Sequence, residues 1–336
     1  MIPNLFKYAT SELSQDAMIC WILEWANTEN KEIDEKMYEI GVNFINSFFN
    51  KFNTIDKPKK YTTIEIRKQY KNIDVLCIIN EEFAILIEDK TSTKNHSGQL
   101  EKYYKEIEKD FHSSKILPIY FKTGDQSDYR SIIKKDYMIY SRVDFLNVLN
   151  SVKYRNDILA DYHKYLQGIE DSVKSYKKLL LNDWSWNSWK GFYINLKEDL
   201  KEGNWDYVSN PSGGFLGFWW HFVGDENVQR YLQIESKYNA KIAIYETKLC
   251  IKIKVSKKQD RKKFRKYWYG KIKERSKELN LKFKKPSRFG NGKYMSILIL
   301  ENDYRKVCKD NIIDMKNTVK FLEEVKSLLD NLEEKF

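Results

Sequence analysis

The spacing of apolar positions changes period twice within the first part of the chain. Apolar residues over 11–27 and 32–53 recur at helical spacing, which predicts two amphipathic helices. Residues 61–70 instead alternate between apolar and polar side chains, and β-branched runs follow over 73–79 and 83–87. Alternation and β-branched runs separated by polar breaks are typical of strands. The pattern therefore predicts two helices followed by three consecutive strands.

A helix–strand alternation then continues to about residue 150. The sequence predicts a helix over 98–111, a strand over 116–121, a strand over 137–140 and a helix from about Asp144. Pro118 interrupts the apolar run of the fourth strand and indicates a position near a sheet edge. This order of elements favours an α/β fold in which helices pack on a central mixed sheet.

The second half of the chain predicts a separate α+β domain. Residues 152–181 resemble one long polar helix, and the tryptophan-rich stretch from Trp184 begins a new pattern. We therefore expect domains over residues 1–150 and 182–336, joined by a helical linker over 151–181. The further elements expected are helices over 187–202, 259–280 and 311–333, and strands over 214–223, 231–236, 241–245, 249–255, 281–285 and 294–300.

Composition narrows the class of protein. Hydrophobic residues make up 42% of the chain and charged residues 32%, which suits a folded protein. The sequence has no apolar run of the length that a membrane-spanning helix needs, and its start lacks a signal peptide's apolar core. A cytoplasmic protein without a membrane partner is expected. The four cysteines lie far apart and predict neither zinc nor disulfides.

Positive charge is concentrated in one segment. Between Lys237 and Lys293 there are 21 lysines and arginines but four acids, a net +17 against +11 for the whole chain. Such an uneven distribution of charge along the chain is typical of a protein with a surface that binds phosphates. The helix over 259–280 mixes cations with aromatics, so it is either a nucleic-acid groove or a solvated helix whose aromatics face the core. The nucleic-acid candidates are Lys262, Lys263, Arg265, Lys266 and Trp268.

The hairpin over residues 73–90 carries the candidate chemistry. If its turn centres on Glu81, paired residue numbers sum to 162, and Asp74 faces Glu88. Opposed side chains in a sheet have Cβ atoms about 5 Å apart, so two carboxylates would repel unless a cation lay between them. Carboxylate oxygens at this spacing suit Mg²⁺, which binds phosphate alongside. Lys90 lies two residues beyond Glu88 and shares its face.

Lys90 is therefore placed to orient or activate a water, or to neutralise charge on a phosphate. Asp89 points to the opposite face, so its side chain is not expected to bind the same cation. The alternative interpretation is that these residues are ordinary charges at the ends of strands. Their position at facing ends of two apolar strands, across one tight turn, favours the functional interpretation.

An acid on one strand followed by Glu-x-Lys on the next resembles the signature of the PD-(D/E)XK nuclease superfamily. Gln99 and Tyr103 match the Gln-x-x-x-Tyr motif of its RecB-like branch. Glu12 matches the position from which many members supply an additional metal ligand, and Asp16 lies one helical turn further on. The chain departs from the signature at Ile73, which stands in place of the proline.

The resemblance implies a restriction-endonuclease-like core over residues 1–150. It implies Mg²⁺, with Mn²⁺ able to substitute, and cleavage of nucleic acid with DNA favoured, in defence, restriction or repair. A homodimer stays open, as do two alternatives: an RNA-directed nuclease, and an inactive nucleic-acid-binding or regulatory protein. The implied metal ligands are Asp74, Glu88, Glu12 and the backbone carbonyl of Asp89, and the implied catalytic residues are Asp74, Glu88, Lys90, Gln99 and Tyr103.

Overall fold

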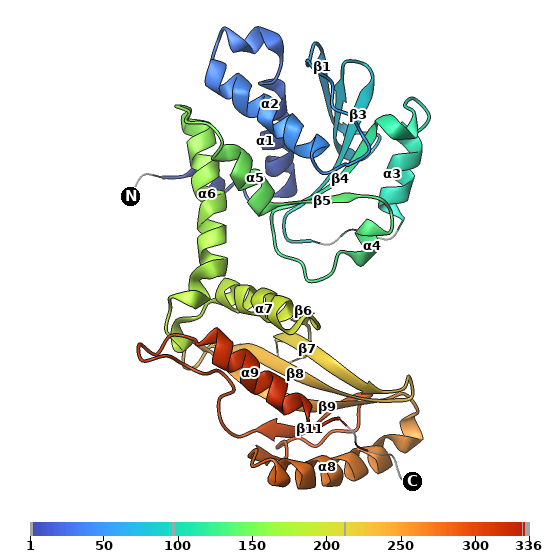
Figure 1. The fold of residues 1–336 in the computed structure, drawn as a ribbon, viewed down its shortest axis with the longest axis vertical. Helices are drawn as coiled ribbons and strands as arrows, with labels where there is room; N and C mark the ends of the chain where they lie inside the picture. The colour runs from blue at the N-terminus through green and yellow to red at the C-terminus, as the bar shows by residue number, and fades with distance from the viewer. Residues whose placement is uncertain (1–2, 94, 96–97, 212, 331, 333–336) are drawn as a thin grey trace. The chain divides into compact units, whose positions relative to one another are not determined.

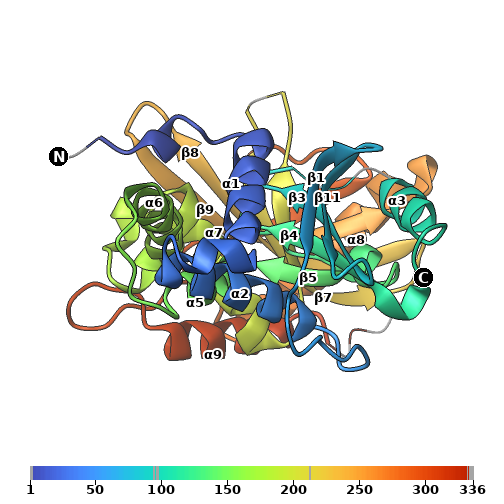
Figure 2. The ribbon, with the colours of Figure 1, turned by 90° about the horizontal axis from the view of Figure 1, so that it is seen from above.

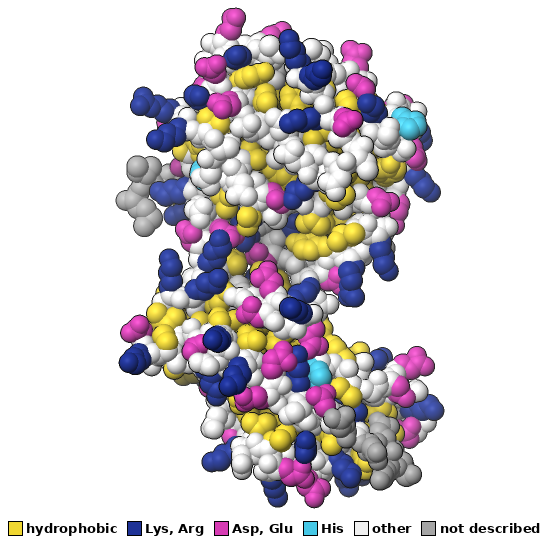
Figure 3. All heavy atoms as spheres, in the orientation of Figure 1, with side chains coloured by type: hydrophobic (Ala, Val, Ile, Leu, Met, Phe, Trp, Pro, Cys, Tyr) yellow, Lys and Arg dark blue, Asp and Glu magenta, His cyan; other side chains and the backbone are white. Residues whose placement is uncertain are grey.

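The computed structural model describes residues 3–93, 95, 98–211, 213–330 and 332. The chain forms two compact units, Met1–Glu170 and Asp171–Phe336 (Figure 1). On the face seen in Figure 3, each unit exposes side chains of both charges, interspersed with apolar ones. No helix in the described part of the chain is long and apolar enough to cross a bilayer.

The first unit is built on a five-stranded sheet in the order β1-β2-β3-β4-β5. Strands β1, β2 and β3 pair antiparallel, whereas β3, β4 and β5 pair parallel, so the sheet is mixed. The expected α/β class with a central mixed sheet is confirmed. The strands are β1 Ile64–Tyr70, β2 Ile73–Ile79, β3 Phe83–Lys90, β4 Ile116–Lys122 and β5 Met138–Ser141.

Helices cover both faces of this sheet. Side chains alternate along each strand. Within 75–79 of β2 and 83–87 of β3, odd-numbered residues pack with α1, α2 and α5, while even-numbered ones pack with α3. Figure 2 shows α1 and α2 on one side of the sheet and α3 on the other. The helices are α1 Glu12–Glu24, α2 Glu35–Phe49, α3 Gln99–Ile107, α4 Arg130–Ile133, α5 Arg142–Leu149 and α6 Asp157–Lys174.

Tight turns set the register of the three antiparallel strands. Lys71 and Asn72 link β1 to β2 with φ angles of 54° and 69°, as a type I′ turn requires. Between β2 and β3, the observed pairs run from Val75 with Ile87 to Ile79 with Phe83. Each pair sums to 162, so the predicted register of this hairpin is confirmed.

The edge position expected for the fourth strand is wrong. Strand β4 lies between β3 and β5, and Pro118 is opposite Leu86 of β3. Proline is tolerated there because pairing with β5 begins only at Ile119. The part of β4 that contains Pro118 therefore has a described strand partner on one side only.

The second unit contains a six-stranded antiparallel sheet in the order β10-β11-β9-β8-β7-β6. One face packs against α7, α8 and α9 in a core rich in aromatic residues. The strands are β6 Asn204–Val208, β7 Phe215–Gly224, β8 Val228–Asn239, β9 Ile244–Val255, β10 Phe283–Lys284 and β11 Tyr294–Leu300. The helices are α7 Trp186–Leu200, α8 Arg261–Glu278 and α9 Met315–Lys326.

Several elements of the second half differ from the expectation. The run 249–255 and the last two residues of the run 241–245 belong to one strand, β9, which pairs with β8 along its whole length. Residues 241–243 form the turn before it. Strand β6 is absent from the sequence prediction; it is only five residues long, and Trp205 is its one buried residue. The long helix expected over 152–181 is α6, which gives way to two short 3-10 turns. The 3-10 turns are Leu5–Lys7, Thr28–Lys31, Ser113–Lys115, Ser175–Lys177, Leu181–Asp183 and Lys258–Asp260.

Candidate active site

The side chain of Lys90 ends among oxygen atoms at the end of β3. Its Nζ lies 2.6 Å from Glu88 Oε1 and 3.5 Å from Asp74 Oδ2. It also donates a hydrogen bond of 2.7 Å to the backbone carbonyl of Asp89. The structure thus brings Asp74, Glu88 and the Asp89 carbonyl around one positive charge.

Glu12 joins this group from the first turn of α1. Ser11 caps the helix by accepting a hydrogen bond from the Ser14 amide, which leaves Glu12 as the first helical residue. Glu12 Oε2 lies 3.9 Å from Lys90 Nζ. Its Oε1 accepts hydrogen bonds from the Thr91 amide and the Thr93 hydroxyl at 3.2 and 2.6 Å. A helix far away in sequence therefore contributes a fourth oxygen-bearing group.

Two further contacts hold the Asp74 carboxylate. Its Oδ2 accepts a 2.8 Å hydrogen bond from the Asp89 amide, and its Oδ1 accepts one of 3.3 Å from Gln69 Nε2. Gln69 also donates to Asp16 Oδ2 at 3.0 Å, so its amide bridges two carboxylates. Sequence reasoning missed Gln69. Its position opposite Asp74, between the pairs Lys68–Val75 and Tyr70–Ile73, is the signal that could have found it.

Burial sets the charge state of the central pair. Glu88 is 1% exposed, and burial, with the charge of Asp74, raises the pKa of its carboxyl to about 7. Neither Glu88 oxygen accepts a well-aligned hydrogen bond among the described residues, although Lys90 forms an ion pair with it. Burial lowers the pKa of Lys90, but the charges of Glu88, Asp74 and Glu12 raise it above its ordinary value. Lys90 is therefore an ammonium at neutral pH.

Asp89 directs its side chain to the opposite face, as the alternation along β3 predicts. Its Oδ1 accepts a 2.5 Å hydrogen bond from Gln15 Nε2, and Gln15 Oε1 accepts one of 2.7 Å from Thr123. Burial raises the pKa of Asp89 well above its usual range, although the hydrogen bond from Gln15 lowers it. The charge of nearby Asp16 raises this pKa further. Burial and the charge of Asp74 raise the pKa of Asp16 to about 6. Sequence reasoning missed Gln15, whose role depends on the packing of α1 against the sheet.

Gln99 and Tyr103 lie on α3, which packs against the face of the sheet that carries Glu88. Gln99 Nε2 donates a 2.9 Å hydrogen bond to the Tyr103 hydroxyl, so the two side chains share one helix face as expected. Burial raises the pKa of Tyr103, and the charges of Glu88 and Asp74 contribute. The hydroxyl is thus within electrostatic range of the carboxylates. Gln99 Oε1 is buried and has no hydrogen-bond donor among the described residues.

The donor set around Lys90 is suited to a hard divalent cation. The described residues contain no preformed group of three or more His, Cys, Asp or Glu side chains able to hold a metal. Mg²⁺ does not require one, since it commonly uses one or two carboxylates and keeps several waters. Asp74, Glu88 and the Asp89 carbonyl supply such oxygens. The lack of well-aligned donors to buried Glu88 fits a role in cation binding.

The basic helix α8 requires a correction. Trp268 is completely buried, with the Arg230 guanidinium 3.7 Å from its ring centroid, so the indole is not available to stack on a base. Arg265 is 8% exposed and donates from Nη1 to the carbonyls of Phe289 and Gly290. Trp268 belongs to the core of the second unit, whereas Arg265 holds the loop that precedes β11, so neither side chain is presented to a nucleic acid. The exposed candidates on this helix are Lys262, Lys263 and Lys266.

Comparison with known proteins identifies a matching family. A family model described as the PD-(D/E)XK nuclease superfamily matches residues 3–182, slightly more than half of the chain. No curated protein and no solved structure matches the chain. The matched residues include Glu12, Asp74, Glu88, Lys90 and the helix that carries Gln99 and Tyr103.

Proposed function

The chain belongs to the PD-(D/E)XK nuclease superfamily, and from that premise we propose that it is a Mg²⁺-dependent nuclease acting on DNA. A role in defence, restriction or repair is part of the proposal. The observation that carries it is the convergence of Asp74, Glu88 and the Asp89 carbonyl on the ammonium of Lys90. Carboxylates bind the metal ion that assists phosphodiester hydrolysis, and a neighbouring lysine adds positive charge where the phosphate reacts.

In this proposal Asp74, Glu88 and the Asp89 carbonyl hold the cation, with Glu12 as an additional ligand. When bound, such an ion acidifies a coordinated water and offsets negative charge on the phosphate. The raised pKa of Lys90 keeps its side chain protonated, so it donates hydrogen bonds and does not remove a proton from water. Its ammonium is suited to orienting a water and to stabilising charge on a phosphate oxygen.

Gln99 and Tyr103 act as positioning residues in the proposed mechanism. The hydrogen bond between them presents the Tyr103 hydroxyl on the same face as Glu88. Gln99 Oε1, which has no donor among the described residues, is able to accept a hydrogen bond from substrate or water. This arrangement supports the assignment to the RecB-like branch, whose motif these two residues match.

A cleavage assay across substrate types tests the proposal. Purified full-length protein is incubated with plasmid, linear and single-stranded DNA and with RNA, in Mg²⁺, Mn²⁺ or EDTA. We expect cleavage of DNA in Mg²⁺ and Mn²⁺ and none in EDTA. Cleavage of RNA alone would replace the proposed substrate, and binding without cleavage of any substrate would favour the inactive regulatory protein.

Substitution of the central residues tests the site assignment. Asp74→Ala and Lys90→Ala should each lower the cleavage rate at least about 100-fold, since each removes a charge next to the reacting phosphate. Lys60→Ala, an exposed lysine outside the site, is the matched control and should cleave at the wild-type rate. Circular dichroism checks that both variants fold. Near wild-type cleavage by either site variant would disprove the assignment.

A further inference from the structure

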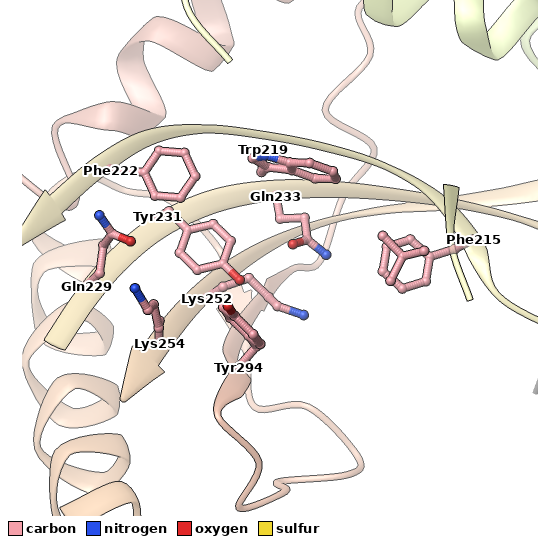
Figure 4. Close-up of a pocket in the computed structure, with 10 residues that line it drawn as sticks. Phe215, Trp219, Phe222, Gln229, Tyr231, Gln233, Lys252, Lys254 and Tyr294 are labelled. Carbon is pink, nitrogen blue, oxygen red and sulfur yellow. The ribbon is translucent and has the colours of Figure 1, made fainter. Parts of the chain in front are cut away.

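One face of the sheet in the second unit is hollowed and lined with aromatic side chains. Alternate residues of each strand pack with α7, α8 and α9, whereas the residues between them surround a hollow of about 500 Å³ (Figure 4). A register shift in β7 between Trp220 and Val223 brings Phe222 to the hollow as well. The aromatic side chains that line it are Phe215, Trp219, Phe222, Tyr231 and Tyr294. We call this surface the aromatic hollow.

The rings of the aromatic hollow are partly open to solvent. Phe222 is 48% exposed and Tyr294 is 57% exposed, so a large part of each ring is open to solvent. Phe222 stacks on Tyr231 with ring centroids 5.0 Å apart and planes 23° from parallel. An exposed cluster of large aromatic side chains on a sheet face marks a binding surface.

A glycine lets two of these rings approach each other. Gly217 lies between Phe215 and Trp219 on the same strand, β7, and all three share a face. A Cβ atom at position 217 would lie 3.0 Å from Phe215 Cε2 and 3.2 Å from Trp219 Cζ3. A larger residue would push the two rings apart, so the glycine shapes this end of the hollow.

The charge of the aromatic hollow is positive. Lys252 and Lys254 line it, and none of the described residues that line it is acidic. Glu235, the nearest acid along β8, is paired with Lys252 at 3.1 Å and with Lys248 at 2.8 Å. Lys254 has no ion pair within the described part of the chain. The hollow therefore presents cations beside exposed aromatic faces.

We propose that the aromatic hollow binds unpaired nucleotides of a single-stranded nucleic acid. Bases would stack on the exposed rings of Phe222 and Tyr294, and Lys254 would contact the backbone phosphates. Stacking on aromatic side chains beside cations is the general means of binding single strands, because every base has a π-face. Bases in a duplex are already stacked and cannot enter such a hollow.

Two glutamines add hydrogen-bonding capacity to the hollow. Gln229 and Gln233 lie on the same face of β8 as Tyr231, and their amides offer both donors and acceptors. Gln233 Nε2 donates to Glu235 Oε1 at 2.9 Å, so its amide is held in place. An amide beside a stacked base is able to form hydrogen bonds with the edge of that base. An apolar ligand would have no use for such an amide.

The aromatic hollow is distinct from the basic surface of α8. Trp268 of α8 packs against Arg230 of β8. Arg230 lies on the side of β8 that faces the core, together with the other even-numbered residues Leu232 and Ile234. The hollow is lined by odd-numbered residues of the same strand. Substitutions in the hollow therefore leave the α8 lysines in place, and the two surfaces can be tested separately.

Fluorescence anisotropy with labelled oligonucleotides tests the role of the rings. Full-length protein is titrated in EDTA, without cleavage, against single-stranded DNA, single-stranded RNA and a duplex. Phe222→Ala and Tyr294→Ala should each weaken single-strand binding about 5- to 150-fold, the range expected for loss of one stacked base. Tyr238→Ala is the control, because Tyr238 is 50% exposed on the same strand as Tyr231 but does not line the hollow.

A second variant tests the role of charge. Lys254→Gln should lower the salt dependence of single-strand binding by about 0.7 in the log–log slope, the value for one lost phosphate contact. Lys320→Gln, at an exposed lysine on α9, should leave the slope unchanged. Preference between the DNA and RNA strands identifies which polymer the hollow takes.

Two results would overturn the proposal. The first is that both aromatic variants bind single strands as tightly as the wild type does. The second is that the wild type binds the duplex as tightly as a single strand, and that the aromatic substitutions weaken both kinds of binding equally. Because binding is measured without cleavage, the outcome is independent of the proposed nuclease activity. A chain that binds single strands through the hollow but cuts nothing would refute the nuclease proposal alone.

Discussion

The buried carboxyl of Glu88 links the candidate site to the stability of the first unit. Its pKa is about 7 in the folded chain and 4.5 in a model peptide. Below pH 4.5 the carboxyl is protonated in both states, whereas above pH 7 it is ionised in both and buried at a cost. Stability should therefore fall as pH rises between these values, by about 3 kcal/mol from this group.

Urea unfolding across this pH range, in EDTA, measures the effect of Glu88. The Glu88→Gln variant should lose this part of the pH dependence, because an amide does not titrate. Glu24→Gln, at an exposed residue of α1, serves as the control and should follow the wild type. Parallel curves for wild type and Glu88→Gln would show that the carboxyl is not perturbed as described.

Gln69 is a second residue whose effect is local. Its amide bridges Asp16 and Asp74, and its φ angle of 54° lies in the left-handed region. We predict that Gln69→Leu raises the Mg²⁺ concentration for half-maximal cleavage about 10- to 100-fold, as loss of a ligand's hydrogen-bond partner does. Gln69→Asn, which tolerates this backbone conformation, should be less severe.

The control for Gln69 is Glu65→Ala. Glu65 lies on the same strand, is exposed and pairs with Arg67 away from the site. Its substitution should leave the Mg²⁺ requirement unchanged. If Gln69→Leu changes the maximal rate but not the Mg²⁺ requirement, Gln69 does not position a metal ligand.

At the scale of elements, the packing of α1 against α2 decides where Glu12 and Asp16 lie. Gly41 of α2 lies directly against α1, and a Cβ atom there would be 2.5 Å from the Ala26 amide nitrogen and 2.9 Å from the Ile22 carbonyl. Both contacts are with backbone atoms, which cannot move aside as a flexible side chain can. The two helices must therefore separate to admit any larger residue.

Gly41→Ala should destabilise the protein by about 1–3 kcal/mol, the usual effect of overpacking. It should also lower cleavage, because α1 carries Glu12. Gly168→Ala is the matched control: Gly168 lies in α6, and nothing is within 4 Å of its added Cβ atom. That variant should gain up to about 1 kcal/mol of helix propensity. Thermal unfolding measures both, and equal midpoints for the two variants would contradict the packing argument.

At the scale of the whole molecule, charge is distributed unevenly. The segment from Lys237 to Lys293 carries +17, although the chain carries +11. In the second unit this charge includes the exposed lysines of α8 and the two lysines of the aromatic hollow. We propose that the α8 lysines bind nucleic-acid phosphates without sequence preference.

Replacing Lys262, Lys263 and Lys266 together with glutamine should weaken duplex binding uniformly across sequences. It should also lower the log–log salt slope by about 0.9 for each lost phosphate contact. Anisotropy titrations at several salt concentrations measure this, with Lys320→Gln as the control. An unchanged slope would return α8 to the interpretation of a solvated helix that only supports the core.

Much of the first unit could be predicted because the information is local. The turn between Ile79 and Phe83 and the alternation on both strands are enough to place Asp74 opposite Glu88, with Lys90 on the same face. The helical spacing of Gln99 and Tyr103 is equally local, and their side chains meet as that spacing predicts. The edge position that Pro118 predicts for β4 is wrong, because strand order depends on pairing between segments far apart in the chain.

The sequence by itself determined the order of elements in the first unit, the hairpin register and the carboxylate–lysine group, because period and turn chemistry act over a few residues. Only the tertiary structure decided that Gln15 and Gln69 support the site, that Trp268 is buried, and that aromatic residues of the second sheet form an exposed hollow. These outcomes depend on which face of each element another element covers. Which face is covered depends on packing between residues far apart in the chain. A pattern of neighbouring residues carries no information about such contacts.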